Sequence, residues 1–190
     1  MSFPTSPVPN YISITSLNPT YTSVTHSLKR QVRTRGGQRW SMDVTFPPLT
    51  RTDFAPVWAF AQKQKGQFGT FTFTPPIYSN TSGTATGTLR VNNSAGYIAG
   101  TTTITVDGLT GTLKAGDFIK FAGHDKVYTI VADATTSLTI EPVLQLPVVN
   151  NEVVTFNAVP FTVSFTSDTQ SMTVGANGFV NFKMKLIEVV

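Results

Sequence analysis

Residues 39–46 alternate strictly between polar and apolar side chains, and this pattern constrains the fold more than any other feature of the chain. The apolar positions of the run are Trp40, Met42, Val44 and Phe46. Because successive side chains of a strand point to opposite faces of a sheet, the period of two predicts a half-buried β-strand and excludes an α-helix here.

A second strand is expected over residues 27–34, with Arg35-Gly36-Gly37 between the two. Glycine readily adopts the positive φ that a tight hairpin connection needs. We therefore predict a long two-stranded hairpin, 27–34 paired with 38–46, whose outer face is basic. Residues 11–16 also include an apolar/polar alternation and are expected to form another strand.

The composition agrees with a β protein. Charged residues make up 13% of the 190, whereas about 25% is usual. Threonine and valine are the commonest residues, and both favour strands. There is no cysteine, which excludes disulfides, cysteine-bound zinc, iron–sulfur clusters and thiol nucleophiles. Residues 1–9 do not resemble a signal peptide and no apolar run is long enough to span a bilayer, so we expect cytosolic synthesis without membrane insertion.

One helix is expected, at about residues 53–65. Asp53 is a suitable N-cap, and Pro56 then lies in the first turn, where its missing N–H costs nothing. The helix is expected to pack on the core through one apolar stripe that recurs at helical spacing, formed by Phe54, Val57, Trp58 and Ala61. Residues 67–74 then read as a strand disturbed at Gly69.

The distribution of charge and pattern divides the chain. Residues 1–65 carry eight basic and two acidic side chains, residues 78–155 carry four and six, and residues 156–190 carry two of each. Residues 78–100 read as loop or weak edge strand. Beyond them five short strands separated by turn signals predict a small barrel or sandwich. They are expected at residues 101–106, 118–121, 127–131, 137–140 and 153–157.

Strong alternation returns at the end of the chain. Residues 161–166 predict a strand, and Asn177-Gly178 marks the turn of a hairpin whose second strand is 179–186. We expect an all-β protein with one short helix. Residues 1–77 plus 156–190 would form a split β-barrel, carrying residues 78–155 as an inserted small β-barrel or sandwich domain.

No catalytic or metal-binding pattern is present. His26 and His124 are far apart in sequence and lack partners at metal-ligand spacing. Nucleophile elbows and phosphate-binding glycine loops are absent. The four aspartates of the middle segment fall at expected turns, and the order of calcium ligands in an EF-hand is missing. They are Asp107, Asp117, Asp125 and Asp133. We expect no enzyme, no cofactor and no metal.

The basic hairpin is the strongest candidate for a binding site. It carries five cations within eleven residues and no acid, namely Lys29, Arg30, Arg33, Arg35 and Arg39. Our first interpretation is contact with an acidic surface of a neighbouring subunit. The second is an edge strand whose charges prevent unwanted pairing. Nucleic acid ranks third, because the nearby aromatics lie on the opposite face and offer no stacking platform.

Several motifs together resemble a known family. They are Arg35-Gly36-Gly37-Gln38-Arg39-Trp40, Phe46-Pro47-Pro48-Leu49-Thr50, Phe54-Ala55-Pro56-Val57-Trp58-Ala59-Phe60, Gly66-Gln67-Phe68-Gly69-Thr70-Phe71 and Pro75-Pro76. In this order, and with a closing hairpin ending near Leu186-Ile187-Glu188-Val189, the chain resembles the distal tail proteins of long-tailed bacteriophages. That family is related in fold to tail-tube proteins, and the resemblance covers residues 11–77 and 160–190.

The resemblance implies a split β-barrel flanked by a helix, assembled as a hexameric ring at the tail tip of the virion. Such a ring joins the tail tube protein to the tail hub protein and to receptor-binding proteins or fibres. The tape measure and later DNA pass through its opening. Many relatives append a carbohydrate-binding-like domain after the barrel, whereas here the extra segment interrupts it.

Three other readings remain open. A tail tube or tail terminator subunit would share the barrel fold. A binding module for host glycan or a partner protein would use exposed aromatics of the middle segment, for which Tyr97 and Tyr128 are the candidates. An enzyme such as a wall hydrolase is disfavoured, because histidine is scarce and cysteine and paired acids are missing.

Overall fold

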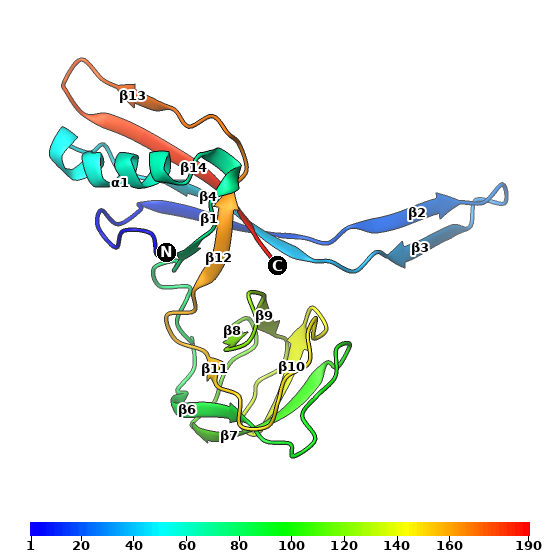
Figure 1. The fold of residues 1–190 in the computed structure, drawn as a ribbon. Coiled ribbons are helices and arrows are strands. Elements are labelled where there is room, and N and C mark those ends of the chain that lie inside the picture. The colour runs from blue at the N-terminus through cyan, green and yellow to red at the C-terminus, as the bar shows by residue number, and fades with distance from the viewer.

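The computed structural model describes all residues, 1–190, and shows a mostly β chain with one α-helix (Figure 1). The strands form two six-stranded sheets and one two-stranded sheet. No helix combines the length and apolar character needed to cross a membrane.

The first sheet is built from the two ends of the chain, in the order β1-β4-β14-β12-β5, with β13 paired to β14. Its strands are β1 (Tyr11–Leu17), β4 (Arg39–Thr45), β5 (Phe71–Phe73), β12 (Phe161–Phe165), β13 (Met172–Val174) and β14 (Val180–Glu188). The predicted strand at 161–166 and the terminal hairpin around Asn177-Gly178 are confirmed.

The predicted pairing of residues 27–34 with 38–46 is wrong. Strand β3 (Arg30–Thr34) pairs with β2 (Thr20–Val24), and β4 pairs with β1. The hairpin therefore turns at residues 25–29, and Gly36-Gly37 forms a bend within its returning side. Between the β1–β4 ladder and the β2–β3 ladder, two residues on one side (18–19) lie opposite four on the other (35–38). The two extra residues cannot be paired and form the bend.

The helix begins earlier than predicted. Helix α1 spans Arg51–Lys63, and its N-cap is Thr50, whose hydroxyl oxygen accepts from the backbone N–H of Asp53. Threonine replaces Asp53 in this role because the cap must precede the first turn by one residue, and Asp53 lies within that turn. The expected strand at 67–74 is also shorter: a 3₁₀ turn, η1 (Gly66–Phe68), precedes β5.

The second sheet is nearly closed and barrel-like, in the order β11-β8-β9-β10-β7-β6. Its strands are β6 (Thr86–Val91), β7 (Thr103–Thr110), β8 (Phe118–Phe121), β9 (Val127–Ile130), β10 (Ser137–Glu141) and β11 (Val154–Thr155). A bridge between Arg90 and Val153 links the two end strands. Strand β6 falls within residues 78–100, expected as loop or weak edge strand, and lies at the end of the sheet order. The turn expected at Asp107-Gly108 is wrong, because β7 continues there and pairs with β6.

Each sheet has its own hydrophobic cluster. The first cluster draws mainly on residues 3–73 and 159–186, and the second on residues 85–156. Two connecting segments join the sheets and lie side by side (Figure 1). The N–H of Val159 donates to Ser79 O at 3.0 Å, and the N–H groups of Ala158 and Thr81 donate to Asn80 and Asn157 side chains.

Candidate functional site

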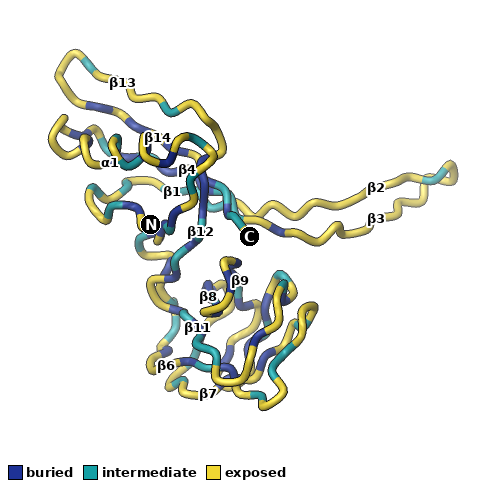
Figure 2. Tube along the Cα trace, in the orientation of Figure 1, coloured by how far each residue is buried: buried dark blue, intermediate teal, exposed yellow.

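A two-stranded arm, residues 18–37, projects away from both sheets (Figure 1). It consists of β2, a turn and β3, and every residue in it except Thr25 is exposed (Figure 2). Its apolar side chains are not buried: Leu28 at the turn is 85% exposed and Tyr21 is 61% exposed. Leu28 also adopts a positive φ of 61°, which is unusual for a bulky residue.

The basic residues do not share one face, so the expectation of a single basic outer face is wrong. Tyr21 pairs with Arg33 in the β2–β3 ladder, and the Arg35 guanidinium lies 4.6 Å from the Tyr21 ring centroid. Arg30 pairs with Val24 instead, and its side chain points to the face opposite that of Tyr21 and Arg33. The reason is the spacing along β3: Arg30 and Arg33 are three residues apart, so the alternation of a strand places them on opposite faces.

None of the five predicted contact residues forms an ion pair. Lys29 lies in the turn of the arm and Arg39 begins β4, while the other three lie on or directly after β3. The four ion pairs of the structure all involve other cations, which are Lys114, Lys120, Lys126 and Lys185. The cationic charge of the arm is therefore available to an acidic partner.

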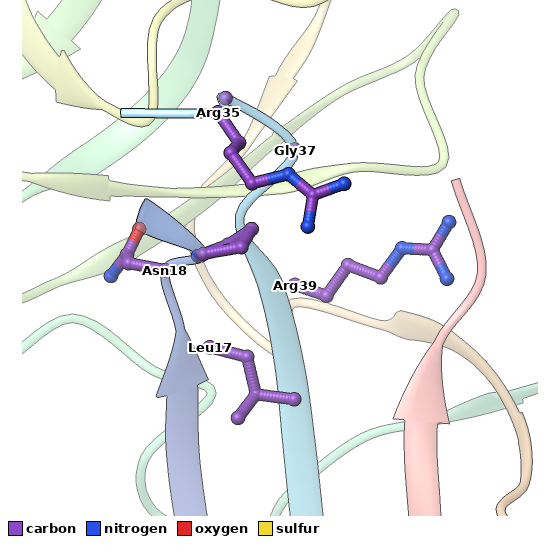
Figure 3. A pocket seen from close by; sticks show the side chains of 7 residues that line it. Leu17, Asn18, Arg35, Gly37 and Arg39 are labelled. Atoms are coloured by element: carbon purple, nitrogen blue, oxygen red, sulfur yellow. The ribbon is translucent and has the colours of Figure 1, made fainter. Parts of the chain in front are cut away.

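The base of the arm contains a hollow of about 550 Å³. One wall is formed by residues 17–19, between β1 and β2. The other is formed by the segment between β3 and β4, which includes Gly36 and Gly37. Figure 3 shows the Arg35 and Arg39 guanidinium groups extending on the same side of this bend. Both glycines have positive φ, 67° and 70°, which side-chain-bearing residues rarely adopt. Two adjacent guanidinium groups are suited to binding carboxylates.

Trp40, predicted on the apolar face of its strand, packs on the first cluster and lies at the junction of the two sheets. Its ring packs edge-on against Phe118, with the ring centroids 5.1 Å apart, and its indole N–H donates to Val127 O at 2.9 Å. Its backbone N–H donates to the carboxylate of Glu188 at 3.1 Å. The residue therefore connects β4 with both β9 and the end of β14.

Glu188 and Lys126 form a buried ion pair at the same junction. Their side chains are 0% and 2% exposed, and Glu188 also accepts from the backbone N–H of Val127 at 2.8 Å. Burial lowers the pKa of Lys126, an effect that the hydrogen bond and charge of Glu188 oppose. The Glu188 carboxylate thus has three donors and ties the β8–β9 turn to the first sheet.

The predicted helix residues face the first cluster. Phe54, Val57 and Ala61 are buried, and Trp58 is partly buried against the cluster. The Phe54 ring lies 5.3 Å from Phe182 of β14, centroid to centroid. These contacts hold α1 against the sheet and leave the arm at the far side.

Tyr128 is not an exposed aromatic, contrary to the prediction. It is fully buried because β9 faces the second cluster at this position. Its hydroxyl accepts from the N–H of Gln145 at 3.1 Å and lies 2.9 Å from Nδ1 of the buried His124. Burial raises the pKa of Tyr128 to about 12. Tyr97 is partly buried, and its hydroxyl oxygen accepts from Thr105 N–H. Hydrogen bonding to the side chain and then to the backbone of Thr105 lowers the pKa of Tyr97, against the opposing effect of burial.

Acid should weaken the second sheet through His124. Burial lowers the pKa of His124 below its usual 6.5, so the folded form holds the ring neutral. The unfolded chain takes up a proton as the pH falls through about 6.5, so the unfolding free energy drops below that pH by at most about 1.4 kcal/mol per unit. Urea unfolding from pH 7.5 to 5 should show this loss in the wild type and not in His124→Gln. Equal pH dependence in both would contradict the assignment.

Three of the four aspartates of the middle segment, Asp117, Asp125 and Asp133, have structural partners. Asp117 is buried and accepts from Ser82 N–H, Ser82 Oγ and Lys114 N–H. Burial acts to raise its pKa, but these hydrogen bonds and one from Thr81 outweigh it, so the pKa is lowered. Asp133 pairs with Lys114. No three histidine, aspartate or glutamate side chains gather closely enough to hold a metal ion.

Glu188 and Lys126 are not among the residues predicted from the sequence. For Glu188 a signal was present, because it continues the inward-facing parity of Val180, Phe182, Met184 and Leu186. A carboxylate at such a position must be paired when buried. No signal in the sequence marked Lys126 as its partner.

No protein-family model matches the chain, and no curated protein sequence matches it.

Proposed function

We propose that the chain is a non-enzymatic structural subunit of a bacteriophage tail tip, a distal tail protein that assembles into a ring through its arm. The observation that carries the proposal is the arm itself, because nothing in the single chain covers it. The family resemblance of residues 11–77 and 160–190 supplies the biological setting.

An isolated two-stranded ribbon is marginally stable in water. Here both faces of β2 and β3 are exposed, with Tyr21, Val24 and Val32 unburied. Packing against a neighbouring chain would bury these side chains and supply acids for the unpaired arginines. A contact between an arm and a different surface of the next copy is head-to-tail, and such contacts close into a ring when the rotation permits.

The finer architecture belongs to the same proposal. The first sheet with α1 would be a split, tail-tube-like barrel, and residues 78–155 an inserted domain carried on the ring. The proposed partners are other copies in a hexamer, the tail tube protein, the tail hub protein, and receptor-binding proteins or fibres. A tube or terminator subunit is the alternative within this class, because the same arm would serve either.

Charge reversal on the arm tests the proposal. Arg33→Glu with Arg35→Glu should abolish assembly while the monomer keeps its circular dichroism spectrum, because both side chains are exposed and unpaired in the single chain. Light scattering after size exclusion and negative-stain images should show rings for the wild type only. Lys63→Glu with Lys65→Glu, two exposed cations away from the arm, is the matched control. Rings from the arm variant would refute the proposal, as would a wild type that stays monomeric at high concentration.

A further inference from the structure

The structure contains two buried side-chain polar atoms without a hydrogen-bond partner, and both belong to residues that line one hollow. They are Gln38 Oε1 and Thr129 Oγ1, and the hollow has a volume of about 300 Å³. Gln38 is 5% exposed, and its Nε2 already donates to Ser16 Oγ at 2.8 Å. A buried acceptor without a donor costs about 1–3 kcal/mol, so a donor entering this hollow would be stabilised.

The hollow lies between the base of the arm and the second sheet. Trp40 forms part of its wall, and Glu141 stands at its rim, exposed and without an ion pair. Glu141 pairs with Thr129 in the β9–β10 ladder, which places both side chains on the same face. The residues that line the hollow thus carry three acceptor groups, the Glu141 carboxylate, the Gln38 amide oxygen and the Thr129 hydroxyl, and the last two have no hydrogen-bond partner within the chain.

We propose that this hollow binds a guanidinium group, supplied by Arg30 from the arm of a second copy. A guanidinium has five N–H donors in one plane and accepts nothing, which matches a site offering a carboxylate, an amide oxygen and a hydroxyl. The indole of Trp40 adds an aromatic wall, against which a planar cation packs favourably. The inference rests on the proposed assembly through the arm and names the surface that the arm meets.

Arg30 is the most suitable donor on the arm. It is exposed, forms no ion pair, and points away from the face on which Arg35 covers Tyr21. It cannot reach the hollow of its own chain. From Asn18 at the base to Val24 opposite Arg30 the strand takes six steps, roughly 20 Å, and the arm points away from the sheets (Figure 1). The contact is therefore intermolecular and head-to-tail.

Cross-linking tests the contact directly, because the chain has no cysteine of its own. The double variant Arg30→Cys with Glu141→Cys, treated with a short bismaleimide, should give a ladder of covalent dimers and higher oligomers on a denaturing gel. Arg30→Cys with Asp107→Cys is the matched control, since Asp107 is an exposed acid of the same sheet on β7. Equal ladders from both pairs, or no ladder from the first, would overturn the inference.

A charge exchange is the second test. Arg30→Glu and Glu141→Arg alone should each weaken self-association about tenfold, the equivalent of roughly 1.4 kcal/mol, and the combined exchange should restore it. Sedimentation velocity measures this, and circular dichroism confirms folding. If the wild type assembles but neither single change weakens it, or the exchange does not restore it, solvent alone fills the hollow and only this inference falls. A monomeric wild type would overturn the proposed function with it.

Discussion

Replacing Glu188 by alanine is expected to lower the free energy of unfolding by about 3–5 kcal/mol. The change leaves the ammonium of Lys126, whose side chain is 2% exposed, without a counter-charge at the junction of the two sheets. It also removes the acceptor of two backbone N–H groups, those of Trp40 and Val127. Urea unfolding followed by tryptophan fluorescence measures the loss, because Trp40 lies at the junction.

The matched control removes both charges. Lys126→Met with Glu188→Gln should be distinctly more stable than Glu188→Ala, because no uncompensated charge is left in the interior and the glutamine amide keeps one acceptor. A loss below about 1 kcal/mol for Glu188→Ala would show that the ion pair adds little. Simple addition of the two single-variant losses in a double variant would show that the charges do not interact.

The strands that carry alternation were predictable, and their partners were not. The strict period of two identified β4, β12 and β14, because β4 and β14 bury one face against the first cluster and β12 contributes all its apolar side chains to that cluster. Gly36-Gly37 predicts a hairpin turn, because adjacent glycines between two strands usually mark one. The actual turn uses Thr25, whose hydroxyl lies 3.0 Å from Ser27 Oγ and accepts from Lys29 N–H, and it has no glycine. Hydroxyl-based turns leave a weaker trace in a sequence than glycine does.

Part of the candidate site could be predicted from the sequence and part depends on register. The excess of positive charge on residues 29–39 is visible in the order of residues alone. The spacing of Arg30 and Arg33 already puts them on opposite faces, but which residues of β2 they lie against depends on the position of the turn, because the turn sets the register of the pairing. The hollow formed by Gln38, Thr129 and Glu141 joins positions about 100 residues apart in sequence. Only the packing of the two sheets brings them together.

Removing the arm should abolish assembly and leave the monomer folded. Leu17 and Arg39 are directly paired at the end of the β1–β4 ladder, so residues 18–38 can be replaced by Asn-Gly, which closes a two-residue hairpin. The deletion removes Gln38 as its single buried residue, so the thermal midpoint of the monomer should change by only a few degrees, on the order of the effect of 1 kcal/mol.

The expected pair of results separates an arm that serves assembly from one that serves folding. Ring particles should disappear from negative-stain images, and light scattering should give the monomer mass at every concentration. A variant of equal arm length, with Val24 and Val32 replaced by threonine, tests whether apolar contact contributes to assembly. It keeps the strands and the charges. It should assemble more weakly, because the face that carries Val24 and Val32 loses apolar area. Rings from the deleted chain would mean that the neighbouring copies meet elsewhere, whereas an unfolded monomer would mean that the arm stabilises its own sheet.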